Sequence, residues 1–370
     1  MCVMKRLECD KMKTLKYLVI SILIIAAGIG GYAIYGSYRM NQLSSMTFEE
    51  MLLYTTRDNK DVVITVGTIQ DGKVAYDVYG ENGVKLSPTE HIYEIGSITK
   101  TFTTSLLCKA ISEGKISLDN SVDEYLNLPG KEYYPTIRRL VTHTSGLRRY
   151  YFEMPMISNF LSGINVFNGI TEEMLIKRLG EINLDDRDYP FKYSNFGTAT
   201  LGTVLERIYD EDFTTLMNNY VLEDLGLINT KISKMSGDLG NYWTWSQSDA
   251  YMPAGALLSN ITDMMKYVQM HILEDPGYLS IAHEALAGVN ASTVMHAKMG
   301  IRTDSVGVGW MIDEEKRIIW HNGATGNFNC YIGFEKENKI GVVVLSNLPP
   351  DDKIPATVMG IEILTSLLDS

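Results

Sequence analysis

The order of apolar and polar positions along this 370-residue chain predicts β-strands near both ends and helices between them. Two runs rich in Val, Ile and Tyr, 62–70 and 73–80, flank the turn signal Asp71-Gly72 and predict a hairpin. A capping box at 47–50 predicts a helix that ends near Thr56. The same reasoning predicts four more strands and a closing helix toward the C-terminus: 308–313, 317–321, 328–334, 339–346 and the helix 356–368.

Between these two groups of strands, the pattern over about 97–300 indicates mostly helices and long loops. We therefore predict an α+β fold in which one antiparallel sheet is built from both chain ends, with flanking helices and a largely helical inserted region. The helix predicted over 97–112 begins at the seam between these parts, where small-molecule sites usually lie.

The N-terminal part carries a separate signal. Residues 17–38 contain no charged side chain and are long enough to span a bilayer as one helix. Five lysines or arginines precede this segment and only Arg39 follows closely, so the positive-inside rule places 1–16 in the cytoplasm. We expect a transmembrane anchor at 17–38, a linker at 39–46 and an extracytoplasmic domain at 47–370. A cleaved signal peptide is the alternative.

Charge and cysteine usage narrow the function classes. A formal net charge of -12 argues against a nucleic-acid partner. Cys2 and Cys9 precede the apolar segment, whereas Cys108 and Cys330 fall in predicted core segments, so we expect free thiols without a disulfide framework. The chain has no C-x-x-C or H-E-x-x-H pattern and its six histidines are scattered, which predicts neither a metal nor another cofactor.

A serine and a lysine three residues apart open the helix predicted over 97–112. Ser97 and Lys100 lie on one face of that helix, within reach of each other. A lysine can take the proton of a serine hydroxyl when burial favours its neutral amine, and the apolar residues that follow supply that burial. A second match, Ser112 with Lys115, lies where Gly114 ends the helix and lacks this apolar surrounding. A helix N-cap serine beside a solvated lysine is the alternative interpretation.

Two later motifs offer further polar groups. Tyr193 and Asn195 project the same way if their segment is extended, and a phenol beside a cationic lysine has a lowered pKa and can accept protons. A second Tyr-x-Asn match at 125–127 weakens the pattern taken alone. The run 321–324, His-Asn-Gly-Ala, ends a predicted strand, where glycine lets a ligand approach and the next N–H can face an oxyanion. A simple strand terminus with a turn is the alternative.

Together with 95–102, 140–147 and Pro253-Ala254-Gly255, these motifs resemble the serine β-lactamase and penicillin-binding-protein superfamily. The likeness is to the branch of class C β-lactamases, D-amino-peptide hydrolases and related esterases, and it runs from about Phe48 to the C-terminus. It implies a β-lactamase/transpeptidase-like fold and a structural role for 140–147. The implied site residues are the nucleophile Ser97, its base Lys100, the proton carrier Tyr193, and the substrate-binding Asn195, His321, Gly323 and Ala324.

In more detail, the resemblance implies that Asn195 orients Lys100 and the substrate, and that the N–H groups of Ser97 and Ala324 form an oxyanion hole. His321, which would face the bound acyl compound, replaces the lysine of the family's K-T-G motif. With an ordinary pKa of ~6.5 it is mostly uncharged at neutral pH, so we expect it to hold a carboxylate weakly and to set the acid side of activity.

The sequence therefore predicts a membrane-anchored extracytoplasmic serine hydrolase that acts through an acyl-enzyme on D-amino-acid-containing or cell-wall-derived peptides. An esterase or weak β-lactamase of the same family is one alternative, and a non-catalytic pseudoenzyme that binds wall fragments is another. Specificity depends on loops such as 149–168, whose shape the sequence leaves open. Neither the true substrate nor the oligomeric state follows from the sequence.

Overall fold

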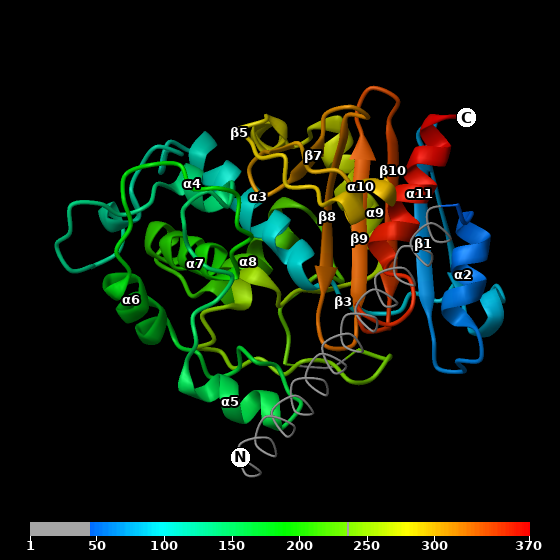
Figure 1. Ribbon diagram of the computed structural model, residues 1–370, viewed down its shortest axis with the longest axis horizontal. Helices are drawn as coiled ribbons and strands as arrows, with labels where there is room; N and C mark the ends of the chain where they lie inside the picture. Colours follow the sequence, from blue (N-terminus) through cyan, green and yellow to red (C-terminus); the bar gives the residue numbers. More distant parts are fainter. Residues whose placement is uncertain (1–44, 235–236) are drawn as a thin grey trace, which may run out of the picture. The chain divides into compact units, whose positions relative to one another are not determined.

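Strands from both ends of the chain pair in one antiparallel sheet in the computed structural model, which describes residues 45–234 and 237–370 (Figure 1). A second, two-stranded sheet pairs β3 (Tyr93–Glu94) with β4 (Leu258–Ser259). The large sheet contains, in spatial order, β2 (Lys73–Tyr79), β1 (Ile64–Gln70), β10 (Ile340–Ser346), β9 (Asn329–Glu335), β8 (Ile318–Ala324), β7 (Met311–Asp313), β6 (Ser305–Val306) and β5 (Ala287–Gly288).

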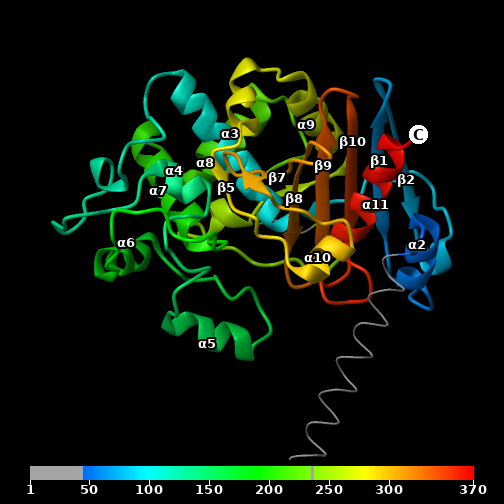
Figure 2. The same cartoon turned by 45° about the horizontal axis from the view of Figure 1, so that its top comes forward.

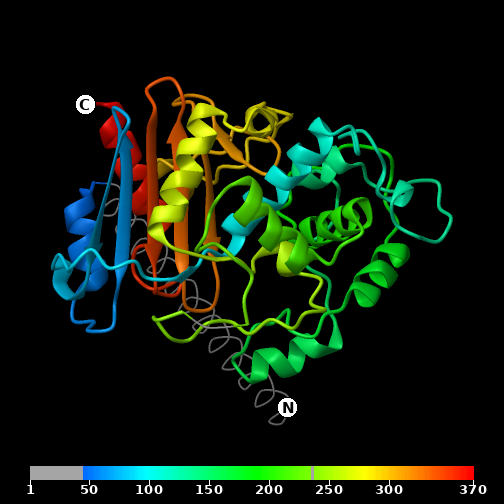
Figure 3. The ribbon, with the colours of Figure 1, turned by 180° about the vertical axis from the view of Figure 1, so that it is seen from behind.

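The register of the sheet joins the N-terminal hairpin to the C-terminal strands. Asp71-Gly72 forms the turn between β1 and β2, and β1 pairs with β10 from Ile64 opposite Ser346. Every residue of β9 and β10 is buried, because helices cover both faces of the sheet centre. Helix α11 (Ala356–Leu368) packs on one face beside α2 (Phe48–Thr56), and α9 (Ile261–Leu273) packs on the other (Figures 1 and 3).

Helix α3 (Thr99–Ser112) joins the sheet to the inserted helical region (Figure 2). It is buried from Thr99 to Cys108, and Phe102 stacks on Tyr267 of α9 with ring centroids 3.9 Å apart. The other helices of this region are α4 (Ile137–Val141), α5 (Met154–Leu161), α6 (Glu172–Glu181), α7 (Asn195–Tyr209) and α8 (Phe213–Asn219). The short helix α10 (Val294–Lys298) lies instead against the sheet near α11 (Figures 1 and 2).

The structure confirms the predicted α+β architecture and most element positions. The capping box is formed, since Thr47 Oγ1 accepts from the Glu50 N–H while the Glu50 carboxylate accepts from the Thr47 N–H. The strand predicted over 308–313 is wrong in its first half, because Gly309 has a φ of +78° and the Gly307 N–H bonds to the Trp310 carbonyl, which makes a turn. The strand predicted to end at position 321 instead continues as β8 to Ala324.

The predicted anchor at 17–38, together with 1–16 and most of the linker 39–46, lies outside the described residues. Among the residues that the structure describes, none of the helices has the length and apolar character needed to cross a bilayer. Thr47–Ser370 form one compact unit.

Candidate active site

Ser97 lies in the 3₁₀ turn Gly96–Ile98, which connects β3 to the start of α3. The side chain is half-buried and reaches two cavities of about 490 Å³ and 290 Å³. Ser97, Arg149 and Ala324 line both cavities. The lining of the larger cavity also includes Tyr193, Asn322 and Gly323. The lining of the smaller cavity also includes Tyr150, Phe167 and Asn195. A substrate could therefore approach the serine from either side of the seam between the sheet and the helices.

Lys100 is the group beside the serine. Its side chain is buried, with 1% exposed, and its Nζ lies 2.9 Å from Ser97 Oγ and donates to the Ala254 carbonyl at 2.6 Å. Burial, and secondly the charge of Arg149, hold the pKa of this amine well below its usual range. The expectation that burial favours a neutral lysine is confirmed, and such an amine can accept the serine proton.

Tyr193 lies close to both Lys100 and Ser97. Its ring centroid is 4.9 Å from Lys100 Nζ, and its buried Oη has no hydrogen-bond partner among the described residues. Burial raises the pKa of this phenol above its usual value, an effect that the nearby Ser97 hydroxyl and Arg149 only partly offset. The prediction of a lowered phenol pKa is wrong, because the burial of this phenol outweighs the neighbouring groups that favour its charged form. In the resting site the neutral phenol can donate a proton.

The loop that carries Tyr193 is fixed by the segment around His143. The Lys192 N–H donates to the His143 carbonyl at 2.9 Å, and the Ser194 N–H donates to His143 Nδ1 at 3.3 Å. The ring centroids of His143 and Tyr193 lie 4.7 Å apart. Burial lowers the pKa of His143 to about 3, so the imidazole stays neutral and acts as an acceptor that positions this loop.

Asn195 follows Tyr193 at the first residue of α7. Ser194 caps this helix by accepting from the Gly197 N–H at 2.8 Å, which places the asparagine beside the smaller cavity. Its buried Oδ1 has no hydrogen-bond partner in the part of the chain that the structure describes. The Ala254 carbonyl, rather than this oxygen, holds Lys100, which leaves Asn195 Oδ1 available to a ligand.

Strand β8 passes close to the turn that carries the serine. A Cβ at Gly323 would lie 1.9 Å from the Ile95 carbonyl oxygen, and one at Gly96 would lie 2.6 Å from the Ala324 nitrogen. Only glycine fits at both contacts, and Gly96 also has a φ of +49°. This approach brings the backbone of Ala324 beside Ser97, where two N–H groups could face an oxyanion.

His321 is placed differently from the expectation. Successive side chains of a strand face opposite sides, so Trp320 and Asn322 line the larger cavity whereas His321 is buried and lines neither cavity. Its Nδ1 lies 2.6 Å from the Asn322 carbonyl. Burial, and secondly Lys100, lower the pKa of His321 to about 3. The expectation that His321 titrates near neutrality is therefore wrong, and its contact with a bound acyl group stays a prediction.

Comparison with known proteins places this arrangement in a family. A family model described as Beta-lactamase matches residues 60–358. The chain belongs to the β-lactamase family. Its α+β fold is the β-lactamase/transpeptidase-like fold that the sequence motifs implied.

Individual relatives are distant from this β-lactamase-family protein. Protein flp of Staphylococcus aureus strain N315 is 24% identical over 309 residues, covering 76% of this chain and 58% of that protein. The octameric penicillin-binding protein homologue from Pyrococcus abyssi is 25% identical with a TM-score of 0.66, covering 83% of this chain and 74% of the other. The β-lactamase/D-alanine carboxypeptidase from Yersinia pestis complexed with citrate is 19% identical with a TM-score of 0.69, covering 90% and 99%. The chain thus spans little more than half of the curated relative it matches.

Glu94 and Arg149 lie at the site of this family member but were not predicted as site residues by the sequence motifs. Glu94 is buried, and its carboxylate accepts from the Trp243 N–H and the Thr325 hydroxyl, each at 2.5 Å, so it ties three segments around Ser97 together. Burial raises its pKa to about 7. A carboxylate inside the apolar run that precedes the serine could have indicated Glu94. Two adjacent arginines, Arg148 and Arg149, in a chain of net charge -12 could have indicated that Arg149 belongs to the site.

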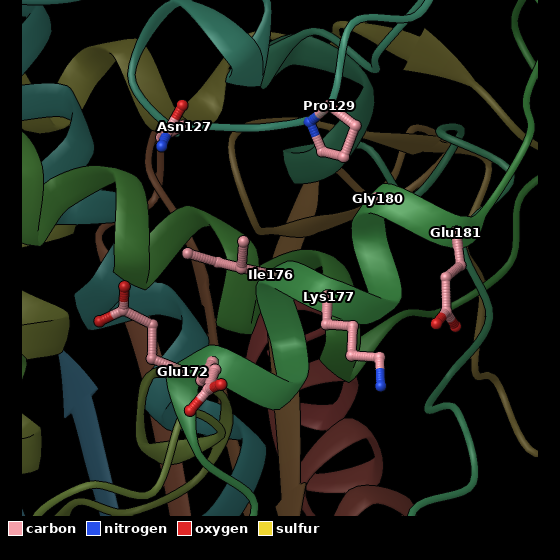
Figure 4. A pocket seen from close by; sticks show the side chains of 8 residues that line it. Asn127, Pro129, Glu172, Ile176, Lys177, Gly180 and Glu181 are labelled. Atoms are coloured by element: carbon pink, nitrogen blue, oxygen red, sulfur yellow. The ribbon is translucent and has the colours of Figure 1, made fainter.

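A further cavity of about 750 Å³ lies along α6, away from these groups (Figure 4). Its lining includes Glu172, Lys177 and Glu181 of the helix together with Asn127 and Pro129, but none of the residues placed at Ser97. The second Tyr-x-Asn match contributes Asn127 to this cavity, whose lining does not include Ser97. Among the described residues no group of three His, Cys, Asp or Glu side chains could hold a metal ion.

We expect the acid limb of the activity profile to stay in place when His321 is replaced by glutamine. With a pKa of about 3 the imidazole is already neutral over the working range, so the limb should report protonation of Lys100, whose neutral amine is the expected base. Activity should fall as the pH drops through that lowered lysine pKa. The measurement is kcat/KM for a neutral ester against pH in the parent and His321→Gln forms, with His283→Gln as a buried histidine outside the site. A shift of more than about one pH unit for His321→Gln alone would contradict this assignment.

Proposed function

We propose that this protein is a membrane-anchored extracytoplasmic serine hydrolase that forms an acyl-enzyme at Ser97. The proposed substrates are D-amino-acid-containing or cell-wall-derived peptides. The observation that carries the proposal is the buried Lys100 amine, 2.9 Å from Ser97 Oγ and with its pKa held low by burial. An N-cap serine with a solvated lysine would show neither feature.

In the proposed acylation step, neutral Lys100 accepts the Ser97 proton while Oγ attacks the substrate carbonyl carbon. The carbonyl oxygen becomes an oxyanion that the N–H groups of Ser97 and Ala324 can stabilise. The tetrahedral intermediate collapses when the bond to the leaving group breaks, and neutral Tyr193 donates the proton that the leaving nitrogen or oxygen needs. The lysine proton then restores the phenol, which returns both groups to their starting states.

Deacylation reverses these roles. Water attacks the acyl carbonyl, its proton passes to the Tyr193–Lys100 pair, and Ser97 Oγ leaves and regains a proton. Asn195 Oδ1 has no hydrogen-bond partner among the described residues, so it is a buried polar atom that a substrate amide or an attacking water could satisfy. Such atoms are costly to leave unpaired in a folded protein, which supports a ligand at this position.

The choice of peptides rests on the form of the site and on its relatives. Two cavities meet at the serine, so a substrate can extend to both sides of the scissile bond, as a peptide does. One solved structure of the same fold is named a β-lactamase/D-alanine carboxypeptidase, and another is a penicillin-binding protein homologue. The neutral, buried His321 at the position of the K-T-G lysine favours the esterase as second candidate.

Membrane attachment is proposed from the uncharged segment 17–38 and its basic N-terminal flank. A second feature supports it. Residues 154–170 carry no charge, and α5 exposes large apolar side chains, with Met154 at 73%, Phe160 at 74% and Leu161 at 78%. An exposed apolar helix is unusual on a protein surrounded by water only, and it fits a domain that an anchor keeps beside a lipid surface.

The test is incubation of the purified full-length protein, in detergent, with a fluorescent penicillin and with a fluorophosphonate, followed by intact mass. Labelling by both reagents supports the peptidase, labelling by the fluorophosphonate alone supports the esterase, and labelling by neither supports the pseudoenzyme. Repeating the reaction on intact cells with a membrane-impermeant fluorophosphonate tests the topology. Labelling that requires permeabilised cells would overturn the extracytoplasmic placement.

A further inference from the structure

Among the described residues that line the two cavities at Ser97, Arg149 is the one permanent cation. Neither lining contains an aspartate or a glutamate, and among the described lining residues the arginine is not accompanied by a lysine. Arg149 contributes to both cavities, so it lies where they meet beside the nucleophile. The local charge is therefore positive in a protein whose net charge is -12, which points to an anionic ligand group.

The backbone around Arg149 is fixed to the catalytic loop. Its carbonyl accepts from the Phe196 N–H at 3.1 Å, and the carbonyl of Arg148 accepts from the Ser194 hydroxyl at 2.7 Å. These bonds join the arginine to the N-terminal end of α7, the same segment that presents Tyr193 and Asn195. The backbone of Arg149 is thus attached to a positioned part of the site, and its exposed side chain extends from there.

Arg149 also differs from the other arginines nearby in its partners. Arg139 pairs with two aspartates and Arg178 pairs with two glutamates, with the closest contact of each pair between 2.6 and 2.9 Å. No carboxylate lies within ion-pair distance of Arg149 in the part of the chain that the structure describes. Arg148 is exposed as well, but it faces the ring of Tyr151 and lines neither cavity.

Resting on the proposed acyl-enzyme function, we propose that Arg149 binds a carboxylate of the substrate and makes this enzyme selective for carboxylate-bearing peptides. A planar guanidinium can grip a carboxylate with two parallel hydrogen bonds, whereas His321 is buried, neutral and outside both cavities. The arginine therefore takes over the anion-binding task that the K-T-G lysine would perform, from a different loop. The carboxylate that Arg149 binds belongs to a peptide fragment and can be the free C-terminus of that fragment.

The test uses two thioesters that differ only in charge. One is an acylglycyl thioester of D-thiolactic acid, whose leaving group carries a free carboxylate, and the other is its carboxamide. Thiol release by the full-length protein gives kcat/KM for each. The parent should prefer the carboxylate, and Arg149→Gln should reduce that preference by roughly ten- to a hundredfold, mainly through KM, as expected for lost hydrogen bonds to a charged group. Arg149→Lys should retain part of the preference.

Arg148→Gln is the matched control, because it removes an adjacent exposed arginine that lines neither cavity, and it should leave the preference unchanged. Loss of the Arg149 charge should also raise the pKa of Lys100 and move the acid limb for the neutral carboxamide to higher pH. That limb reports on the lysine, while the ratio between the two thioesters reports on carboxylate binding. Equal preference in the parent, or an unchanged ratio in Arg149→Gln, overturns the inference and leaves the hydrolase function standing. Absence of both thioester hydrolysis and fluorophosphonate labelling overturns the two together.

Discussion

Replacing Ser97 with alanine should abolish covalent labelling by the fluorophosphonate, and Lys100→Ala should slow labelling by about three powers of ten or more. The first change removes the attacking oxygen. The second removes the amine that lies 2.9 Å from it, and members of one catalytic unit show large individual losses. The measurement is the second-order rate of adduct formation, followed by intact mass.

Ser112→Ala and Lys115→Ala are the matched controls, since these residues have the same spacing at the other end of the same helix. The structure gives them ordinary surface roles: Ser112 Oγ donates to the Lys109 carbonyl, and Lys115 pairs with Glu113 at 2.8 Å. Both variants should label at the parental rate. If the second pair were the damaging one, the assignment of the nucleophile would be wrong.

Gly323→Ala should both destabilise the protein and slow its reaction with the probe. The added Cβ would lie 1.9 Å from the Ile95 carbonyl oxygen, a backbone atom that cannot turn aside as a flexible side chain could. We expect the free energy of unfolding to fall by about 3 kcal/mol, at the upper end of the usual range for overpacking. Labelling should slow by about a hundredfold or more, because Ala324 would move away from Ser97 and weaken the oxyanion contact.

Gly288→Ala is the control for this prediction. Gly288 belongs to β5 of the same sheet, and a Cβ there would have no heavy atom within 4 Å. Denaturant unfolding and labelling rates should be measured for both variants. A Gly323→Ala protein with the stability and labelling rate of Gly288→Ala would show that the close contact between β8 and the turn is not needed.

The buried histidines illustrate why the sequence alone did not predict the charge states of titratable side chains. His143 and His321 would each titrate near neutrality in water, yet burial lowers the pKa of both to about 3. Both imidazoles must stay neutral in the folded protein and become protonated in the unfolded chain below about pH 6.5. Stability is therefore expected to decline as the pH falls below that value, and is fully present above it.

Local sequence features determined several elements and the contact between Ser97 and Lys100. The turn at Asp71-Gly72 and the capping box at 47–50 depend only on neighbouring residues, and they form as predicted. The pairing of Ser97 with Lys100 also follows from sequence, because the geometry of one helical turn brings residues three apart together. An apolar helix around them was enough to predict a neutral lysine.

Only the tertiary structure decided the pKa values of the site residues and which side chains line the two cavities. Lys100 is held by the carbonyl of Ala254, 154 positions away, and its pKa depends partly on Arg149 from yet another loop. Burial raises the pKa of the Tyr193 phenol, so this group keeps its proton, which reverses the role predicted for its resting state. The one-residue alternation of β8 turns His321 away from both cavities, while Arg149 enters them. Protonation and accessibility are set by burial and by charges from distant segments, and those neighbours exist only after the chain has folded.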